Sequence, residues 1–199
     1  MSIAKIIRHF EAIGRVPVSV ADVLKQVQAV VLDEVVEVRA LDRSADKIRG
    51  FHYRYHNQPH ADSALMPESI AVAAYSIQQP LGWQRLVCCK ELIHIFDREP
   101  ICTSSKEEVV RLGQKLTGES HFEKVDGENI QWFFDEIAKY QALAILFPFG
   151  LREELLAIKP PEKHDLAAIS DVVQLPIEMV YTVMSDKWPL LREGILANG

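Results

Sequence analysis

The sequence has few cysteines and no long uninterrupted run of apolar residues. Its three cysteines are odd in number, and Cys88 and Cys89 are adjacent, a pattern that does not suit a disulfide framework and favours a reducing compartment. Charges at Lys5 and Arg8 interrupt the start of the chain, so that stretch lacks the features of a secretion signal or a membrane span. We therefore expect a cytoplasmic protein without a membrane partner.

An excess of basic charge is also missing. The 22 Lys and Arg residues are outnumbered by 28 Asp and Glu residues, and the formal net charge is −6. Because nucleic-acid binders present a basic surface, this balance disfavours a nucleic-acid partner. The composition is otherwise ordinary for a folded protein, since 48% of the residues are apolar and 199 residues are enough to bury one core.

The spacing of apolar residues predicts two opening helices and then a small sheet. Helical periodicity covers residues 3–13 and stops at Gly14, and Ser19 offers an N-cap for a second helix that ends near residue 27. Runs rich in β-branched residues then indicate a sheet. Its strands are expected within residues 30–40, 51–55 and 70–77.

Helices dominate the rest of the chain. They are expected over residues 80–97, 104–118 and 128–147, with a loop at 121–127, and as three short stretches within 151–184. The last residues of the chain are expected to be loosely held and not packed on the rest of the fold. The predicted fold class is α+β, mostly helical with a small sheet and a C-terminal helical segment. Pro160-Pro161 marks the only plausible boundary between domains or subdomains.

One stretch of the expected helix over residues 80–97 carries a chemical signature. The letters Lys90-Glu91-Leu92-Ile93-His94 differ in one position from H-E-x-x-H. In that motif two histidines one helical turn apart bind zinc, and the glutamate activates the water on the metal. The letter that differs is the first histidine.

Three stretches in order make the chain similar to the ImmA/IrrE family of bacterial and phage-associated metallopeptidases. Residues 6–24 resemble the family's opening helices with their Pro-Val pair, residues 70–94 resemble its strand and the helix that leads into H-E-L-G-H, and residues 135–148 resemble its later helix with acids, alanines and a final proline. The resemblance implies a zincin-like fold. It places a metallopeptidase-like domain over residues 1–158 and a C-terminal helical segment over 159–199.

The resemblance also assigns roles to individual residues. It implies that Glu91 is the general base of an active relative, that His94 is a zinc ligand, and that Asp135 or Glu136 is the acidic third ligand. Lys90 stands where the family has its first histidine, and a protonated amine offers no donor pair and repels the metal. We therefore expect Lys90 to pair with these carboxylates, without a cofactor, in a non-catalytic protein-binding or regulatory module.

Three alternatives remain open for this stretch. The chain could be an active zinc endopeptidase that acts on a repressor-type protein partner, with the missing ligand supplied from elsewhere. It could be a purely structural subunit, or Lys90, Glu91 and His94 could be polar residues with local partners. Cys88 and Cys89 are weaker candidates for substitute ligands, because a cysteine one position before Lys90 points about 100° around the helix from it, and we interpret both as core residues.

His52, His56 and His60 recur at four-residue intervals, which on a helix would form a metal-binding stripe. Aromatic residues alternate with the first two, so the period of a strand fits better and places His52 and His56 on one face. Both are candidates for a peptide-binding groove at a strand edge.

Residues 165–184 have the pattern of two helices joined by a tight turn, as in helix-turn-helix proteins. The second helix carries little basic charge, and Lys187 follows it, so the pattern does not predict DNA recognition. The simplest interpretation is that these two helices pack against the rest of the fold.

Overall fold

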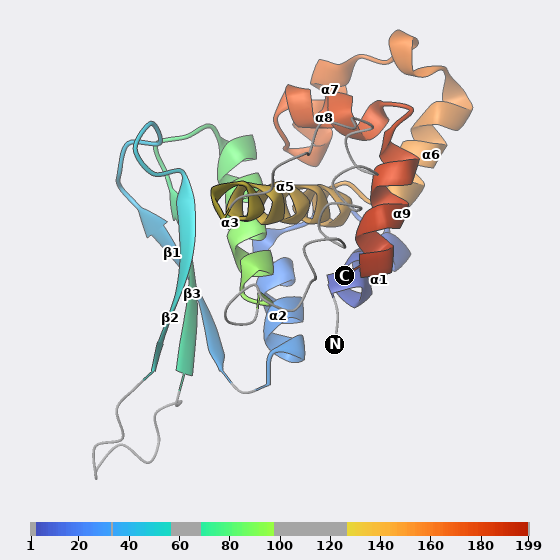
Figure 1. Cartoon of the computed structure of the whole chain (residues 1–199). Coiled ribbons are helices and arrows are strands. Elements are labelled where there is room, and N and C mark those ends of the chain that lie inside the picture. The colour runs from blue at the N-terminus through green and yellow to red at the C-terminus, as the bar shows by residue number, and fades with distance from the viewer. Residues whose placement is uncertain (1–2, 33, 57–68, 98–126, 199) are drawn as a thin grey trace.

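The computed structural model describes residues 3–32, 34–56, 69–97 and 127–198. It contains a three-stranded sheet, and the helices all lie on one face of that sheet (Figure 1). The predicted α+β, mostly helical fold class is confirmed.

The sheet consists of β1 (Val35–Leu41), β2 (Gly50–His56) and β3 (Ser69–Ser76), in the order β1-β3-β2. β1 runs parallel to β3 and β2 runs antiparallel to it, and β2 is an edge strand of the sheet formed by the described residues. His52 lies opposite Ala73, which belongs to the core, whereas Tyr53 lies opposite Val72 on the other face. The alternation of the strand therefore directs His52 towards the helices.

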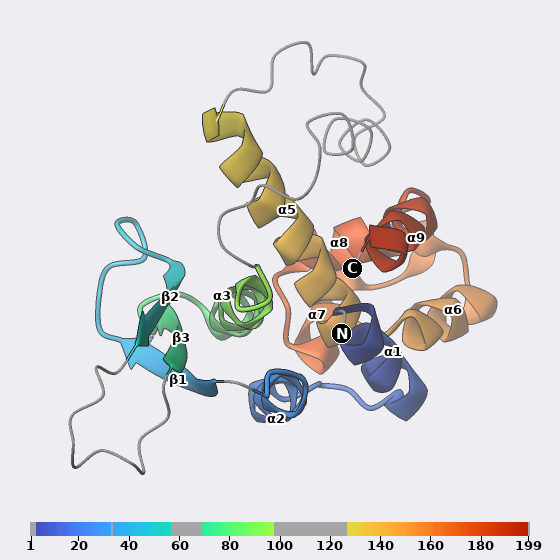
Figure 2. The same cartoon turned by 60° about the horizontal axis from the view of Figure 1, so that its bottom comes forward.

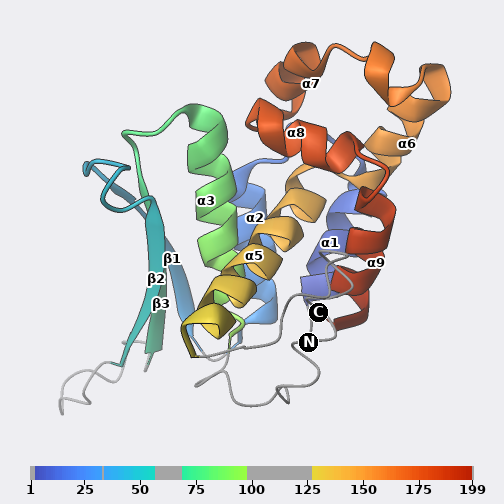
Figure 3. The same ribbon diagram turned by 45° about the horizontal axis from the view of Figure 1, so that its top comes forward.

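Two helices position the candidate site. α3 (Leu81–His94) packs on β3 and β2, and α5 (Gly127–Leu146) crosses α3 on the side away from the sheet (Figure 3). Residues 142–147 are all buried, so the second half of α5 forms the centre of the helical layer. The packing of α3 on the sheet and of α5 on α3 fixes the position of α5 relative to α3.

The remaining helices surround this pair. α2 (Val20–Val30) packs on α3 and β1, and α1 (Ile3–Ile13) packs on α5. The chain after α5 forms α6 (Phe149–Ile158), the 3₁₀ turn η1 (Pro161–Lys163), α7 (Leu166–Val173), α8 (Ile177–Met184) and α9 (Trp188–Asn198). α1 and α9 contact each other, and Figure 2 shows both on the side of α5 away from the sheet.

The predicted ends of the opening helices are largely confirmed. α1 ends before Gly14, which adopts a left-handed φ of 63°, and the Ser19 side chain caps α2 by accepting a hydrogen bond from the Asp22 amide. The prediction that strand structure starts at residue 30 is wrong, because α2 continues to Val30. The Gln28 side chain stabilises the link to β1 by donating to the carbonyl of Glu34 and accepting from the amide of Val36.

The expected loose C-terminus is also wrong. Residues 188–198 form α9, in which Trp188 is fully buried and stacks edge-on against Tyr140 of α5. Arg192 of α9 donates two hydrogen bonds to Glu11 of α1, at 2.7 and 2.8 Å. Apolar residues spaced about one turn apart in α9 hold it against the other helices. The short sequence after Pro189 did not allow this packing to be predicted.

Some predictions lie outside the described residues, namely the helix over residues 104–118 and the loop before residue 127. The domain seam at Pro160-Pro161 stays a prediction; the pair lies at the start of η1. Among the described residues, no single helix is long and apolar enough to cross a bilayer, and only the pair α7 and α8, bent by 106°, meets those criteria together.

We expect Trp188→Ala to lower the free energy of unfolding by about 3–5 kcal/mol, because the cavity left by a fully buried indole cannot collapse between α5 and α9. Leu190→Ala, two residues further on at a position that is 62% exposed, should change it by less than about 0.5 kcal/mol. Urea denaturation of both variants tests this. Equal effects would show that α9 does not pack as described.

Candidate functional site

The candidate site lies where α3 faces both β2 and α5. α3 presents Lys90, Glu91 and His94, α5 presents Asp135, and β2 presents His52. The sequence interpretation named all five, and the fold brings them together. Of the remaining candidates, the side chain of His56 lies outside the described part of the structure.

Lys90 forms ion pairs with residues of both helices. Its Nζ contacts Oδ1 of Asp135 and lies 3.1 Å from Oε1 of Glu91, while its side chain is only 17% exposed. Burial lowers the pKa of Lys90, but the charges of Glu91 and Asp135 and their hydrogen bonds raise it more, so the net shift is upward. Lys90 is therefore a cation at neutral pH.

His94 is held between two carboxylates. Its Nδ1 lies 2.7 Å from Oδ2 of Asp97, and its Nε2 lies 3.3 Å from Oδ1 of Asp135. Burial lowers the pKa of the imidazole, but the hydrogen bonds to Asp135 and Asp97 and their neighbouring charges raise it further, to about 9. Both ring nitrogens then donate, so that His94 is an imidazolium at neutral pH.

Asp135 accepts from both cations at once. The hydrogen bond from His94, together with the hydrogen bond and charge of Lys90, lowers the pKa of Asp135 well below its usual value despite partial burial. The carboxylate is therefore ionised throughout the neutral range, and one oxygen joins α5 to two positions of α3 that are a helical turn apart.

His52 extends this cluster towards the edge strand. Its ring stacks on that of His94 with centroids 5.0 Å apart and an interplanar angle of 17°, and its Nδ1 lies 3.5 Å from Oε2 of Glu91. Glu91 is thus contacted from α3 by Lys90 and from β2 by His52, and it is only 2% exposed.

Two contributors were missed by the sequence interpretation. Asp97 was expected at the end of a helix, but α3 ends at His94, and the turn that follows returns the Asp97 carboxylate to the imidazole. Gly50 was not singled out; a Cβ there would lie 2.3 Å from Cγ1 of Val87 and 3.1 Å from Oε1 of Glu91. Only a glycine allows β2 to approach α3 closely enough for His52 to reach Glu91.

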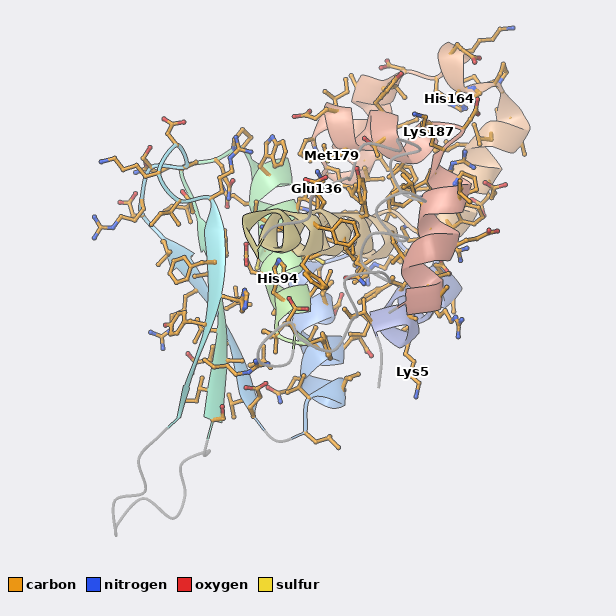
Figure 4. The ribbon with its side chains drawn as sticks, viewed as in Figure 1. Lys5, His94, Glu136, His164, Met179 and Lys187 are labelled. Carbon is orange, nitrogen blue, oxygen red and sulfur yellow. The ribbon has the colours of Figure 1, made fainter. Side chains whose placement is uncertain are left out.

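Glu136, the other candidate for an acidic ligand, is placed differently. Its carboxylate pairs with Lys139 of α5 at 2.6 Å, and Figure 4 shows Glu136 and His94 on opposite sides of α5 in that view. Cys88 and Cys89 are buried free thiols, and burial raises the pKa of Cys88 to about 12 and that of Cys89 further. A thiol held protonated in this way is a poor metal ligand.

The donor set does not fit a catalytic zinc ion. Such a site needs three unprotonated donors that converge on one point. Here an ammonium stands at one position, and both nitrogens of His94 already face carboxylates. Among the described residues, no group of three His, Cys, Asp or Glu side chains is arranged to hold a metal ion.

Comparison of the sequence with known protein families and curated proteins, and of the structure with solved structures, gives no significant match. The site is therefore interpreted from its own geometry.

The raised pKa of His94 predicts a specific loss of stability at alkaline pH. A group whose pKa is about 9 in the folded state and 6.5 ordinarily stabilises the fold fully below pH 6.5 and loses this contribution as the pH rises to 9. We expect the free energy of unfolding to fall by on the order of 2 kcal/mol across this window. In His94→Gln most of that fall should disappear.

His164→Gln is the matched control, because the His164 ring faces the uncharged carbonyl of Lys159. Urea denaturation at closely spaced pH values gives the three profiles. If His94→Gln keeps the slope of the unmodified protein, the imidazole is not clamped as described.

Proposed function

We propose that this chain is a cytoplasmic, ImmA/IrrE-like protein with a degenerate zincin site, and that it acts as a non-catalytic protein-binding or regulatory module. The observation that carries the proposal is the position of Lys90. Its ammonium lies between Glu91 of α3 and Asp135 of α5, next to His94. A fixed side-chain cation in that position supplies the positive charge that a metal would otherwise bring.

The state of Glu91 supports the absence of peptidase chemistry. A general base must reach a water molecule with a free carboxylate oxygen. One oxygen of Glu91 faces the ammonium of Lys90 and the other faces the His52 ring, and the side chain is almost fully buried. A carboxylate engaged on both oxygens stabilises its neighbours instead of activating water.

A protein or peptide partner fits the exposed part of the same region. His52 is 37% exposed on β2, which is an edge strand and can accept an added strand. The resemblance of the sequence to ImmA/IrrE proteins suggests a transcriptional repressor as one such partner. Zinc-dependent cleavage of a repressor-type protein is the alternative, and the metal experiment below separates the two.

We expect protein purified without chelator to contain no stoichiometric zinc, and Lys90→His to acquire it. An imidazole at position 90 would lie one helical turn from His94 and opposite Asp135, which completes three ligands. Elemental analysis should then find about one zinc per chain, and the melting temperature should rise when zinc is added.

Lys139→His provides the control, because it makes the same change at a lysine that is paired with Glu136 away from the cluster. One zinc per chain in the unmodified protein, together with chelator-sensitive peptide cleavage, would overturn the proposal. A Lys90→His variant without any response to zinc would show that the surroundings of the ligands have also changed.

We expect Lys90→Met to destabilise the fold by about 1–3 kcal/mol, because it leaves Glu91 and Asp135 without their shared cation at a half-buried site. Lys139→Met removes a partly exposed pair within one helix and should cost less than about 1 kcal/mol. Chemical denaturation measures both. A larger effect for Lys139→Met would contradict a structural role for Lys90.

A further inference from the structure

α8 and the first turn of α3 expose an apolar surface that the candidate site does not use. Ile177 and Tyr181, one helical turn apart on α8, are 48% and 67% exposed, and Leu81 at the start of α3 is 60% exposed. We call these three residues the α8 face. Exposed aromatic and aliphatic side chains grouped in this way are typical of interaction surfaces.

The α8 face is held together by a close approach of two elements. A Cβ at Gly82 would lie 2.9 Å from the backbone of Leu175 and Pro176, so the first turn of α3 touches the turn between α7 and α8. Arg85 fixes the same junction by donating to the carbonyls of Gln174 and Val18, at 3.1 and 2.6 Å. Leu81 and Ile177 each directly adjoin this contact, and their positions are therefore set in advance of binding.

The segment that contains α7 and α8 is acidic. Between Lys163 and Lys187 the sequence contains four acidic residues and no lysine or arginine. Asp171 and Glu178 are exposed on α7 and α8. Among the described residues of neighbouring elements, Arg85 donates to carbonyl groups at this junction and Arg49 lies over the Trp83 ring at 5.1 Å, so each of these guanidinium groups already has a partner.

We propose that the α8 face docks a basic amphipathic helix of a protein partner. The apolar side of such a helix would cover Ile177, Tyr181 and Leu81, and its flanking lysines or arginines would face Asp171 and Glu178. Asp171 and Glu178 would repel phosphate groups, which favours a protein partner over DNA at this surface. This surface is separate from the ion cluster around Lys90, and the inference does not depend on the function proposed for that cluster.

A pair of designed peptides tests the proposal with the full chain. Each is a helix of about 18 residues with leucines along one face; one carries Lys and Arg on the flanks, and the other carries Glu and Asp at the same positions. We expect the basic peptide to bind in fluorescence anisotropy and to bind more weakly as salt rises, and the acidic peptide to bind at least about tenfold more weakly.

Variants locate the binding. Tyr181→Ala and Glu178→Lys should each weaken binding of the basic peptide by about tenfold without lowering the melting temperature, because both side chains are exposed. Ile158→Ser and Leu190→Ser, at exposed apolar positions outside the α8 face, should leave binding unchanged. Equal binding of both peptides, no binding, or no effect of the first two variants would overturn the proposal. A dimer of this chain that dissociates on Tyr181→Ala would also overturn it, in favour of a second copy as the occupant.

Discussion

The ammonium of Lys90 contacts carboxylates from two different helices at a position where water has little access. Glu91 is almost completely buried, so this acid would be costly if its cation were removed, whereas Asp135 is half exposed and also contacts His94. The ion pair between Lys90 and Asp135 therefore requires α3 and α5 to pack together at this point along the two helices. The same packing brings Asp135 to the imidazole of His94, where its hydrogen bond helps to raise the pKa of His94.

The charged side chains of the cluster pair with one another, and the carboxylates outnumber the cations by one. Lys90 and His94 supply two positive charges, and Glu91, Asp97 and Asp135 supply three negative ones, with His52 stacked at the rim. In a zinc peptidase the same region would keep donor atoms free for the metal. Here the donor atoms of Lys90, His94 and Asp135 are paired with one another.

Part of the candidate site was predictable from local spacing, whereas the acidic positions at 135 and 136 were implied only by the family resemblance. The interval between Lys90 and His94 places both side chains on one side of a helix, and the alternation of β2 places His52 on one face of a strand. The choice between Asp135 and Glu136 was not predictable, because adjacent helical residues point about 100° apart and only the packing of α5 on α3 decides which one faces His94. Asp97 was missed for the same kind of reason, since its contact depends on where α3 ends.

The sequence by itself determined the fold class, the opening helices and the three strands, because apolar periodicity, an N-cap at Ser19 and β-branched runs act over a few neighbouring residues. Tertiary structure alone decided the extent of α2 beyond residue 27, the docking of α9 through Trp188, and the choice of Asp135 over Glu136 as the partner of Lys90 on α5. Those features depend on contacts between residues far apart in the chain, and their energies come from burial and charge compensation that exist only once the helices have packed.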